Sequence, residues 1–142
     1  MALLGQLLEH KGHEVHAVAA GASVIDAIRR MAENHVGALL VMDGGQLIGI
    51  VSERDYARKV ILQGRSSPTT PVRDIMTSPV VTTTPNDTVD HAMRLMTDRR
   101  IRHLPVLQGE VVVGVVSIGD LVRSVIDSQR STIEALQSYI QG

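Results

Sequence analysis

The sequence has no cysteine, phenylalanine or tryptophan, and only two of its 142 residues are tyrosine. The absence of cysteine excludes a disulfide framework and thiolate chemistry, and it fits a reducing compartment. With so few aromatic rings there is little surface on which nucleic-acid bases could stack, and a net charge of −1 gives no general attraction to a phosphate backbone. We therefore expect no binding of nucleic acid.

Long apolar runs are also missing. No segment approaches the roughly 20 apolar residues that span a bilayer. The first residues, MALLGQLLEHKG, lack the basic region and the small-residue cleavage site of a secretory signal. We therefore expect no membrane partner and a cytoplasmic location.

Motifs of catalysis and metal binding are equally scarce. The chain has no P-loop, no Gly-x-Gly-x-x-Gly opening a helix after a strand and no Gly-x-Ser-x-Gly elbow, so we expect a protein that is not an enzyme. His10, His13 and His16 are three residues apart, but a segment that passes from a helix into a strand would not keep them on one face. No cluster of acids accompanies them, and we expect no metal requirement.

An internal repeat dominates what is present. GIVSERDY at Gly49–Tyr56 is echoed by GVVSIGDL at Gly114–Leu121, and a shift of 65 residues aligns Val15 to Ile61 with the second half without a gap. Repetition of this length indicates two copies of one supersecondary unit, which usually pack about a pseudo-twofold axis to bury faces that neither covers alone. A half of this size would bury too little apolar surface to be stable by itself.

Each copy predicts the order β-α-β-β-α, and hence an α+β fold. In the first copy we expect a strand at 13–19, a helix from the Ser23 cap to about His35, a hairpin of 38–43 and 46–52 around Gly44-Gly45, and a helix at 53–62 that turns Tyr56, Val60 and Ile61 inward. In the second copy we expect strands at 79–83, 104–107 and 111–117, and helices at 88–100 and 118–126. We assign residues 1–65 to the first domain with an N-terminal segment, 66–79 to a Pro/Ser/Thr-rich linker, 80–127 to the second domain and 128–142 to an amphipathic helix with Ile133, Leu136 and Ile140 on one face.

The echoed phrase places a serine at the end of a strand and an aspartate three residues later, Ser52 with Asp55 and Ser117 with Asp120. Such a box is a common helix N-cap, worth about 1 kcal/mol, and needs no ligand to explain it. However, the box recurs at the same place in both copies, where a helix N-terminus offers free N–H groups to an anion. An ionised carboxylate there can also accept two hydroxyl hydrogen bonds, as from a ribose. Both interpretations stay open on the residues alone.

These residues resemble the tandem cystathionine β-synthase (CBS) domain pair, and VRDIMTSPVVTTTPNDTVDHAMRLMTDRRIRHLPVLQGEVVVGVVSIGDL follows the pattern of the second domain throughout. The resemblance implies two clefts between the domains that bind adenosine-containing ligands such as AMP, ADP, ATP, NAD or S-adenosylmethionine. It implies that Asp120 holds ribose hydroxyls, Ser117 contacts ribose or phosphate and Val115 lines the adenine pocket. Asp55, Ser52 and Ile50 would do the same in the other cleft.

The segment before each hairpin completes the implied sites. Arg102 and His103 would lie near phosphates, with Ile101 and Pro105 beside the base, whereas Arg99 and Arg100 are expected at a solvated helix end. The first copy has Val36, Gly37 and Ala38 at the positions of Ile101, Arg102 and His103, so Arg54 and Lys59 would take the place of the Arg-His pair. We therefore expect the two clefts to hold phosphate differently.

The leading interpretation is a stand-alone regulatory module that senses adenosine nucleotides and signals by a change in conformation or association. We expect a homodimer and a separate, unidentified effector protein. The alternatives are a structural or oligomerisation module whose boxes only cap helices and, with less support, an enzyme that acts on a nucleotide.

Overall fold

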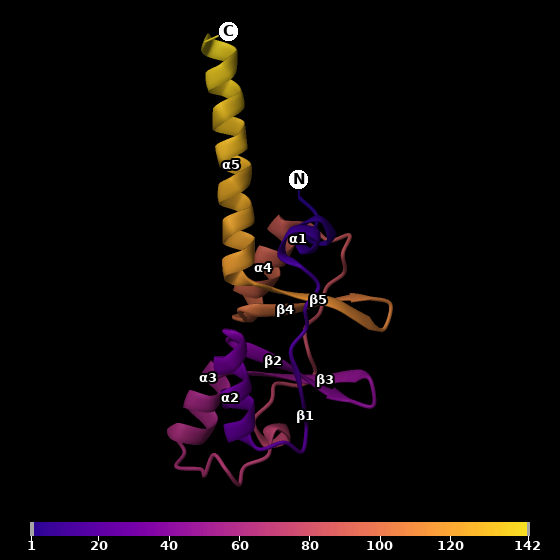
Figure 1. The fold of residues 1–142 in the computed structure, drawn as a ribbon, viewed down its shortest axis with the longest axis vertical. Helices are drawn as coiled ribbons and strands as arrows, with labels where there is room; N and C mark the ends of the chain where they lie inside the picture. Colours follow the sequence, from indigo (N-terminus) through magenta and orange to yellow (C-terminus); the bar gives the residue numbers. More distant parts are fainter. Residues whose placement is uncertain (1, 142) are drawn as a thin grey trace. The chain divides into compact units, whose positions relative to one another are not determined.

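The structure is a computed structural model that describes residues 2–141, and these residues form two compact units. Unit 2 consists of residues 14–81, whereas unit 1 combines residues 2–13 with residues 82–141. Each unit contains one copy of the repeat (Figure 1). The predicted α+β fold of two repeats is confirmed, with one difference: residues 2–13, assigned from sequence to the first domain, pack with the second copy.

A hairpin is the centre of each unit. In unit 2, β2 (Ala38–Asp43) pairs antiparallel with β3 (Gln46–Ser52), and β1 (Ala17–Ala19) adds in parallel to β2. In unit 1, β4 (His103–Gln108) pairs with β5 (Val111–Ser117). The turn of the first hairpin has positive φ at both Gly44 and Gly45, the geometry that a two-residue turn between twisted strands requires. Both predicted hairpins are confirmed.

Two equivalent helices precede the hairpins, α2 (Val24–Asn34) and α4 (Val89–Arg99). The Ser23 side chain accepts a hydrogen bond from the Asp26 N–H, and Thr88 accepts one from His91. Each helix ends at a residue in the left-handed conformation, His35 or Arg100. The predicted helix boundaries are therefore confirmed to within a residue.

The segment before each repeat packs on the other repeat. Helix α1 (Leu4–Lys11) belongs to unit 1, and the short 3-10 helix η2 (Val72–Asp74) belongs to unit 2. Their backbone bonds are equivalent, since Leu4 N–H donates to the Asp87 carbonyl at 2.9 Å and Val72 N–H donates to the Ala22 carbonyl at 2.8 Å. The region predicted as a linker thus contains an element of its own.

The cores follow the repeat. Strands β2 and β4 each bury three consecutive residues, as expected of a strand covered on both faces. In unit 2 the buried apolar side chains include Met31, Leu39, Val51 and Ile75, and in unit 1 they include Leu4, Leu8, Met96, Leu104 and Leu121. Leu4, Leu8 and Ile75 come from the segments that precede the repeats, so each core is completed by chain outside its own repeat.

The strand predicted at 79–83 is wrong. Only Thr83 forms a bridge, in parallel with Val106, although the equivalent β1 pairs three residues. In unit 2, Leu40 N–H donates to the His16 carbonyl at 3.0 Å. The equivalent of Leu40 is Pro105, which has no N–H to donate, so the ladder cannot extend toward Val81. The first strand is also shorter than the predicted 13–19.

Two helix predictions also need correction. The helix predicted at 53–62 is one α-helical turn, α3 (Glu53–Tyr56), followed by a π-helix, η1 (Ala57–Ile61). The wider turn leaves Val60 buried but turns Ile61 outward, with 56% of its surface exposed. The helices predicted at 118–126 and 128–142 are one continuous helix, α5 (Ile118–Gln141), because no Gly or Pro interrupts the segment between them. Residue 142 lies outside the described residues.

The close approach of α1 to β5 gives a stability test. A methyl group at Gly114 would lie 2.6 Å from Cδ2 of the fully buried Leu8, whereas a methyl group at Gly119 would lie 3.6 Å from the nearest atom, Nη1 of Arg123. We expect Gly114→Ala to lower the free energy of unfolding by about 1–3 kcal/mol through overpacking. The control Gly119→Ala should not lower it, since alanine favours a helix. Guanidinium unfolding measures both, and equal stabilities of the two variants would contradict the packing of α1 on β5.

Candidate functional site

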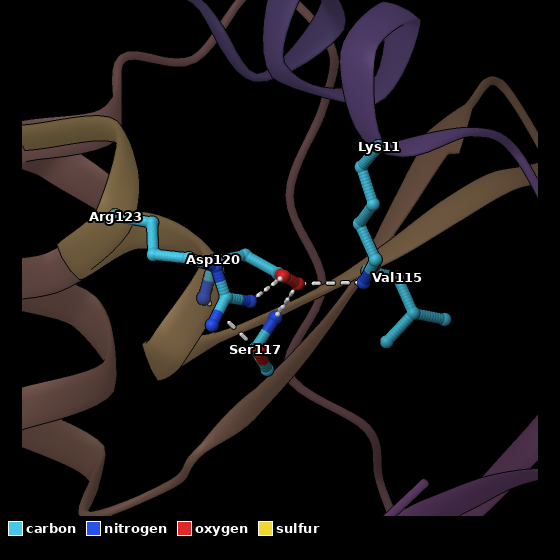
Figure 2. Close-up of polar contacts among 5 residues, drawn as sticks. All are labelled: Lys11, Val115, Ser117, Asp120 and Arg123. Atoms are coloured by element: carbon cyan, nitrogen blue, oxygen red, sulfur yellow. Dashed lines mark hydrogen bonds and ion pairs between the residues drawn. The ribbon is translucent and has the colours of Figure 1, made fainter. Parts of the chain in front are cut away.

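Asp120 lies in the first turn of α5, directly after β5, and both of its carboxylate oxygens accept hydrogen bonds. Oδ2 accepts from the Ser117 N–H at 2.8 Å and from the Lys11 ammonium at 2.6 Å, and Oδ1 accepts from Nη2 of Arg123 at 2.8 Å (Figure 2). The Lys11 ammonium also donates to the Val115 carbonyl at 2.6 Å. The Asp120 side chain is only 9% exposed. An acid capping a helix is thus also the centre of an ionic cluster.

The charge of Asp120 is maintained by these neighbours. Burial alone would raise the pKa of Asp120, but hydrogen bonds from Lys11 and Ser117, together with the Lys11 charge, outweigh burial and lower the pKa below its ordinary value. The carboxylate is therefore ionised at neutral pH and acts only as an acceptor.

Strand pairing links the other predicted residues of the second copy to the segment that ends at Asp120. His103 pairs with Ser117 across the hairpin, and Pro105 pairs with Val115. The Arg102 carbonyl accepts a hydrogen bond from the N–H of Ile118 at 2.9 Å, which ties the segment before β4 to the start of α5. Arg102 is exposed, Ile101 and His103 are half-buried, and Pro105 is buried.

The side chain of His103 is mainly neutral, whereas a phosphate site would favour a cation. Burial and the positive charges of Lys11 and Arg102 lower the pKa of His103, and the opposing effect of Asp120 does not restore it. The neutral imidazole is therefore the main form at pH 7, and it offers one donor and one acceptor in place of a charge. The cations that pair with Asp120 are Lys11 and Arg123.

Asp55 repeats the cap in unit 2. Its Oδ2 accepts from the Ser52 N–H at 2.9 Å and from the Ser52 hydroxyl at 3.0 Å, and the Ser52 Oγ accepts from the Asp55 N–H at 3.1 Å. Its Oδ1 lies 3.1 Å from the Lys59 ammonium, which also donates to the Ile75 carbonyl at 2.9 Å. The Asp55 side chain is 14% exposed. The cation here comes from the same helical segment.

The remaining predicted residues of the first copy follow the same plan. Ala38 pairs with Ser52 across the hairpin, and Ile50 is half-buried on β3. The Gly37 carbonyl accepts from the Glu53 N–H at 3.1 Å, as Arg102 does from Ile118. Val36 is half-buried, and Arg54 is exposed at the start of α3. Within each unit the predicted residues therefore gather around one strand end.

Two participants were missed from the sequence, Lys11 and Arg123. Lys11 precedes the region that aligns between the copies, so the repeat gave no signal for it. Arg123 is three residues after Asp120 and matches Arg58 in the repeat, and this spacing on one helix was a usable signal of an ion pair.

The histidines near the N-terminus have other partners. Nδ1 of His13 lies 2.7 Å from the Val113 carbonyl, and His16 lies within ion-pair distance of Glu14. Over residues 2–141, no three His, Asp or Glu side chains are grouped so as to hold a metal ion. Among the helices of that same range, none combines the length and the apolar character needed to cross a bilayer.

Comparison with known proteins agrees with the repeat. The family model of the CBS domain matches residues 11–61 and 72–127. The chain is 50% identical over 125 residues to the CBS domain-containing protein CBSX3, mitochondrial, of Arabidopsis thaliana, covering 84% of this chain and 61% of that relative. The chain thus spans about three fifths of that protein's length, and the predicted cytoplasmic location stays a prediction.

Solved structures match both repeats together. A protein with CBS domains from Burkholderia ambifaria MC40-6 is 50% identical, with a TM-score of 0.87 over 90% of this chain and 96% of that one. The CBS domain pair of protein MJ0100, solved in complex with 5′-methylthioadenosine and S-adenosyl-L-methionine, is 25% identical, with a TM-score of 0.80 over 90% of this chain and 98% of that one. With two matched segments that together cover most of the sequence, the chain belongs to the CBS-domain family.

Proposed function

We propose that this CBS-domain pair is a regulatory module that binds adenosine nucleotides at two sites, one built on Asp55 and one on Asp120. The ligand would be AMP, ADP, ATP or NAD, and its binding would change the conformation of the pair or its association with an unidentified effector protein. The module would bind the nucleotide without converting it, and no metal would be required.

The observation that carries the proposal is the equivalent position of the two carboxylates. Each uses Oδ2 for the serine N–H that caps its helix, and each presents Oδ1 to a cationic side chain that is partly exposed, 41% for Lys59 and 71% for Arg123. Because the cationic partners are partly exposed, solvent weakens these ion pairs and the cations can exchange partners. The hydroxyls of a ribose can therefore replace the cations without undoing the caps.

The two sites would hold phosphate with different groups. In unit 1, Arg102 is exposed and its carbonyl bonds to the first residue of α5, and its guanidinium can form a bidentate pair with a phosphate. In unit 2 the corresponding groups are Arg54, which is exposed, and Lys59, which is committed to Asp55 and to the Ile75 carbonyl. We expect the sites to differ in affinity or in ligand preference for this reason.

A second candidate function also has an observation in its favour. Both boxes form the hydrogen bonds of a helix cap, which is the geometry expected of a structural module that binds no ligand. Stabilisation by added ligand distinguishes the two functions. A ligand at about 100 times its dissociation constant stabilises a fold by roughly 2.7 kcal/mol, whereas a scaffold without a site is not stabilised.

Substitution of each aspartate tests the proposal. We expect AMP to bind the unsubstituted protein and to raise its melting temperature, and Asp55→Ala and Asp120→Ala each to weaken one site at least about tenfold, through the loss of charge-assisted hydrogen bonds. Isothermal titration with AMP, ADP, ATP and NAD measures this, and mass spectrometry of the mixtures checks for turnover.

The matched control is Asp26→Ala, which removes an exposed acid from the same position of helix α2. It should not change nucleotide binding. If none of the four nucleotides stabilises or binds the protein, or if both aspartate variants bind all four as tightly as the unsubstituted chain, the proposal is wrong. A new product in the mixtures would show an enzyme.

We also propose that the protein is a homodimer joined through α5. Only Leu121 of this helix is buried, although the helix has 24 residues. Helices in proteins gain most of their stability from the packing of an apolar face. Five of the exposed apolar residues of α5 follow a heptad seam, with Ile126, Ile133 and Ile140 at one position and Val122 and Leu136 at the other, where Gln129 stands between them. Such a seam is complementary to itself.

The seam is tested by charge. We expect Ile133→Asp combined with Leu136→Asp to turn the dimer into a monomer, since two carboxylates would be buried in the seam. Ser131→Asp, which is off the seam on the same helix, should leave the dimer intact. Size-exclusion chromatography with light scattering measures the mass. A monomeric unsubstituted protein, or the same mass for both variants, would contradict the seam.

A further inference from the structure

Lys11 is the only residue from outside the second repeat, among those described, that bonds to the Asp120 carboxylate. It is the last residue of α1, and its ammonium bridges Oδ2 of Asp120 and the Val115 carbonyl, both at 2.6 Å (Figure 2). The Lys11 side chain is 37% exposed, whereas that of Asp120 is 9% exposed. Lys11 therefore covers the carboxylate while remaining able to move toward solvent.

Unit 2 has no ammonium at the place of this bridge, and the Lys59 ammonium bridges Asp55 Oδ1 and the Ile75 carbonyl instead. The counterpart of Val115 is Ile50, whose carbonyl accepts a hydrogen bond from the Thr77 N–H at 2.8 Å, while Ile50 N–H donates back to Thr77 at 3.1 Å. In unit 2 a main-chain N–H therefore donates to this carbonyl, whereas in unit 1 the Lys11 ammonium donates to its counterpart. The cation on Asp55, Lys59, comes from η1, four residues along the chain. Lys11 is thus a feature of one site and not of the repeat.

A ribose at Asp120 has to compete with Lys11. Both hydroxyls of a ribose diol would donate to the carboxylate, and the carboxylate oxygens already accept from Ser117, Lys11 and Arg123. When Lys11 leaves, its ammonium loses a charge-assisted hydrogen bond and its ion pair in a partly buried place. Water compensates only in part, whereas a phosphate attached to the same ribose can take the ammonium as a new partner.

Resting on the proposed function, we propose that Lys11 sets the ligand preference of the Asp120 site, so that the site takes adenosine carrying a phosphate and rejects uncharged adenosine. Adenosine must remove the ammonium from Asp120 and offers it no anion in return. AMP removes it and also binds it. Lys11 is thus a specificity residue that touches the ligand's phosphate, and it acts at the Asp120 site only.

The test compares adenosine and AMP in the full-length chain with Asp55→Asn, which isolates the Asp120 site, with and without Lys11→Met. We expect Lys11→Met to strengthen adenosine binding at least about fivefold, because the ammonium no longer competes for Asp120. We expect it to weaken AMP binding at least about threefold, because the charge-assisted contact of the ammonium with the phosphate is lost. The matched control is Arg94→Met, which removes the same charge from an exposed position on α4 of unit 1 and should change neither affinity. Isothermal titration measures both ligands.

Three outcomes overturn this inference. An unchanged ratio of AMP to adenosine affinity shows that Lys11 does not discriminate, and equal strengthening of both ligands shows that Lys11 only blocks the site. Absence of AMP binding to the unsubstituted chain overturns the proposed function and this inference with it, so the two failures are distinguishable. If circular dichroism shows that Asp55→Asn does not fold, the same comparison is made on the chain with Asp55 intact, from the two-site isotherm.

Discussion

A carboxylate fixed at the start of a helix by the main chain of the preceding strand is the interaction on which the rest of this structure depends. Asp55 and Asp120 each accept the serine N–H that ends a strand, and each serine accepts the aspartate N–H in return. The cap holds an ionised oxygen at the junction at little cost in stability. In both units the cap therefore uses Oδ2, while Oδ1 contacts a cationic side chain.

The segment that precedes each repeat packs on the other repeat, and there it contacts the candidate site of that unit. Residues 2–13 complete the core of the second copy and place Lys11 on Asp120, and the segment around η2 completes the core of the first copy and places the Ile75 carbonyl on Lys59. Under the proposed function, a ligand that displaced either cation would disturb a segment that packs on that unit. Such coupling, of a local charge to a packed segment, is what a sensing module requires.

Much of the fold could be predicted from sequence because local chemistry and the repeat agree. Gly44-Gly45 specified a hairpin, Ser23 specified a helix start, and the 65-residue shift transferred each assignment to the second copy. The wrong predictions have local causes, which are differences between the two copies or within one helix that the repeat does not show. Pro105 removes a donor, so the strand at 79–83 does not form, and a π-helical turn carries Ile61 outward.

The candidate site was predicted as far as the repeat extends. Residues on the hairpins and in the boxes gather around Asp55 and Asp120, but Lys11 comes from a segment with no counterpart in the alignment and reaches Asp120 only through tertiary packing. The charge state of His103 depends on burial and on Lys11, neither of which the order of residues reveals. Sequence therefore predicted which side chains gather around the two carboxylates and missed Lys11 and Arg123.

The central claim is that these carboxylates bind both hydroxyls of a ribose, and the most direct measurement compares the affinities of AMP and 2′-deoxy-AMP for the unsubstituted protein by isothermal titration. The account predicts that 2′-deoxy-AMP binds at least about tenfold more weakly, because one charge-assisted hydrogen bond to an ionised acceptor is lost. Equal affinities for the two ligands would contradict it.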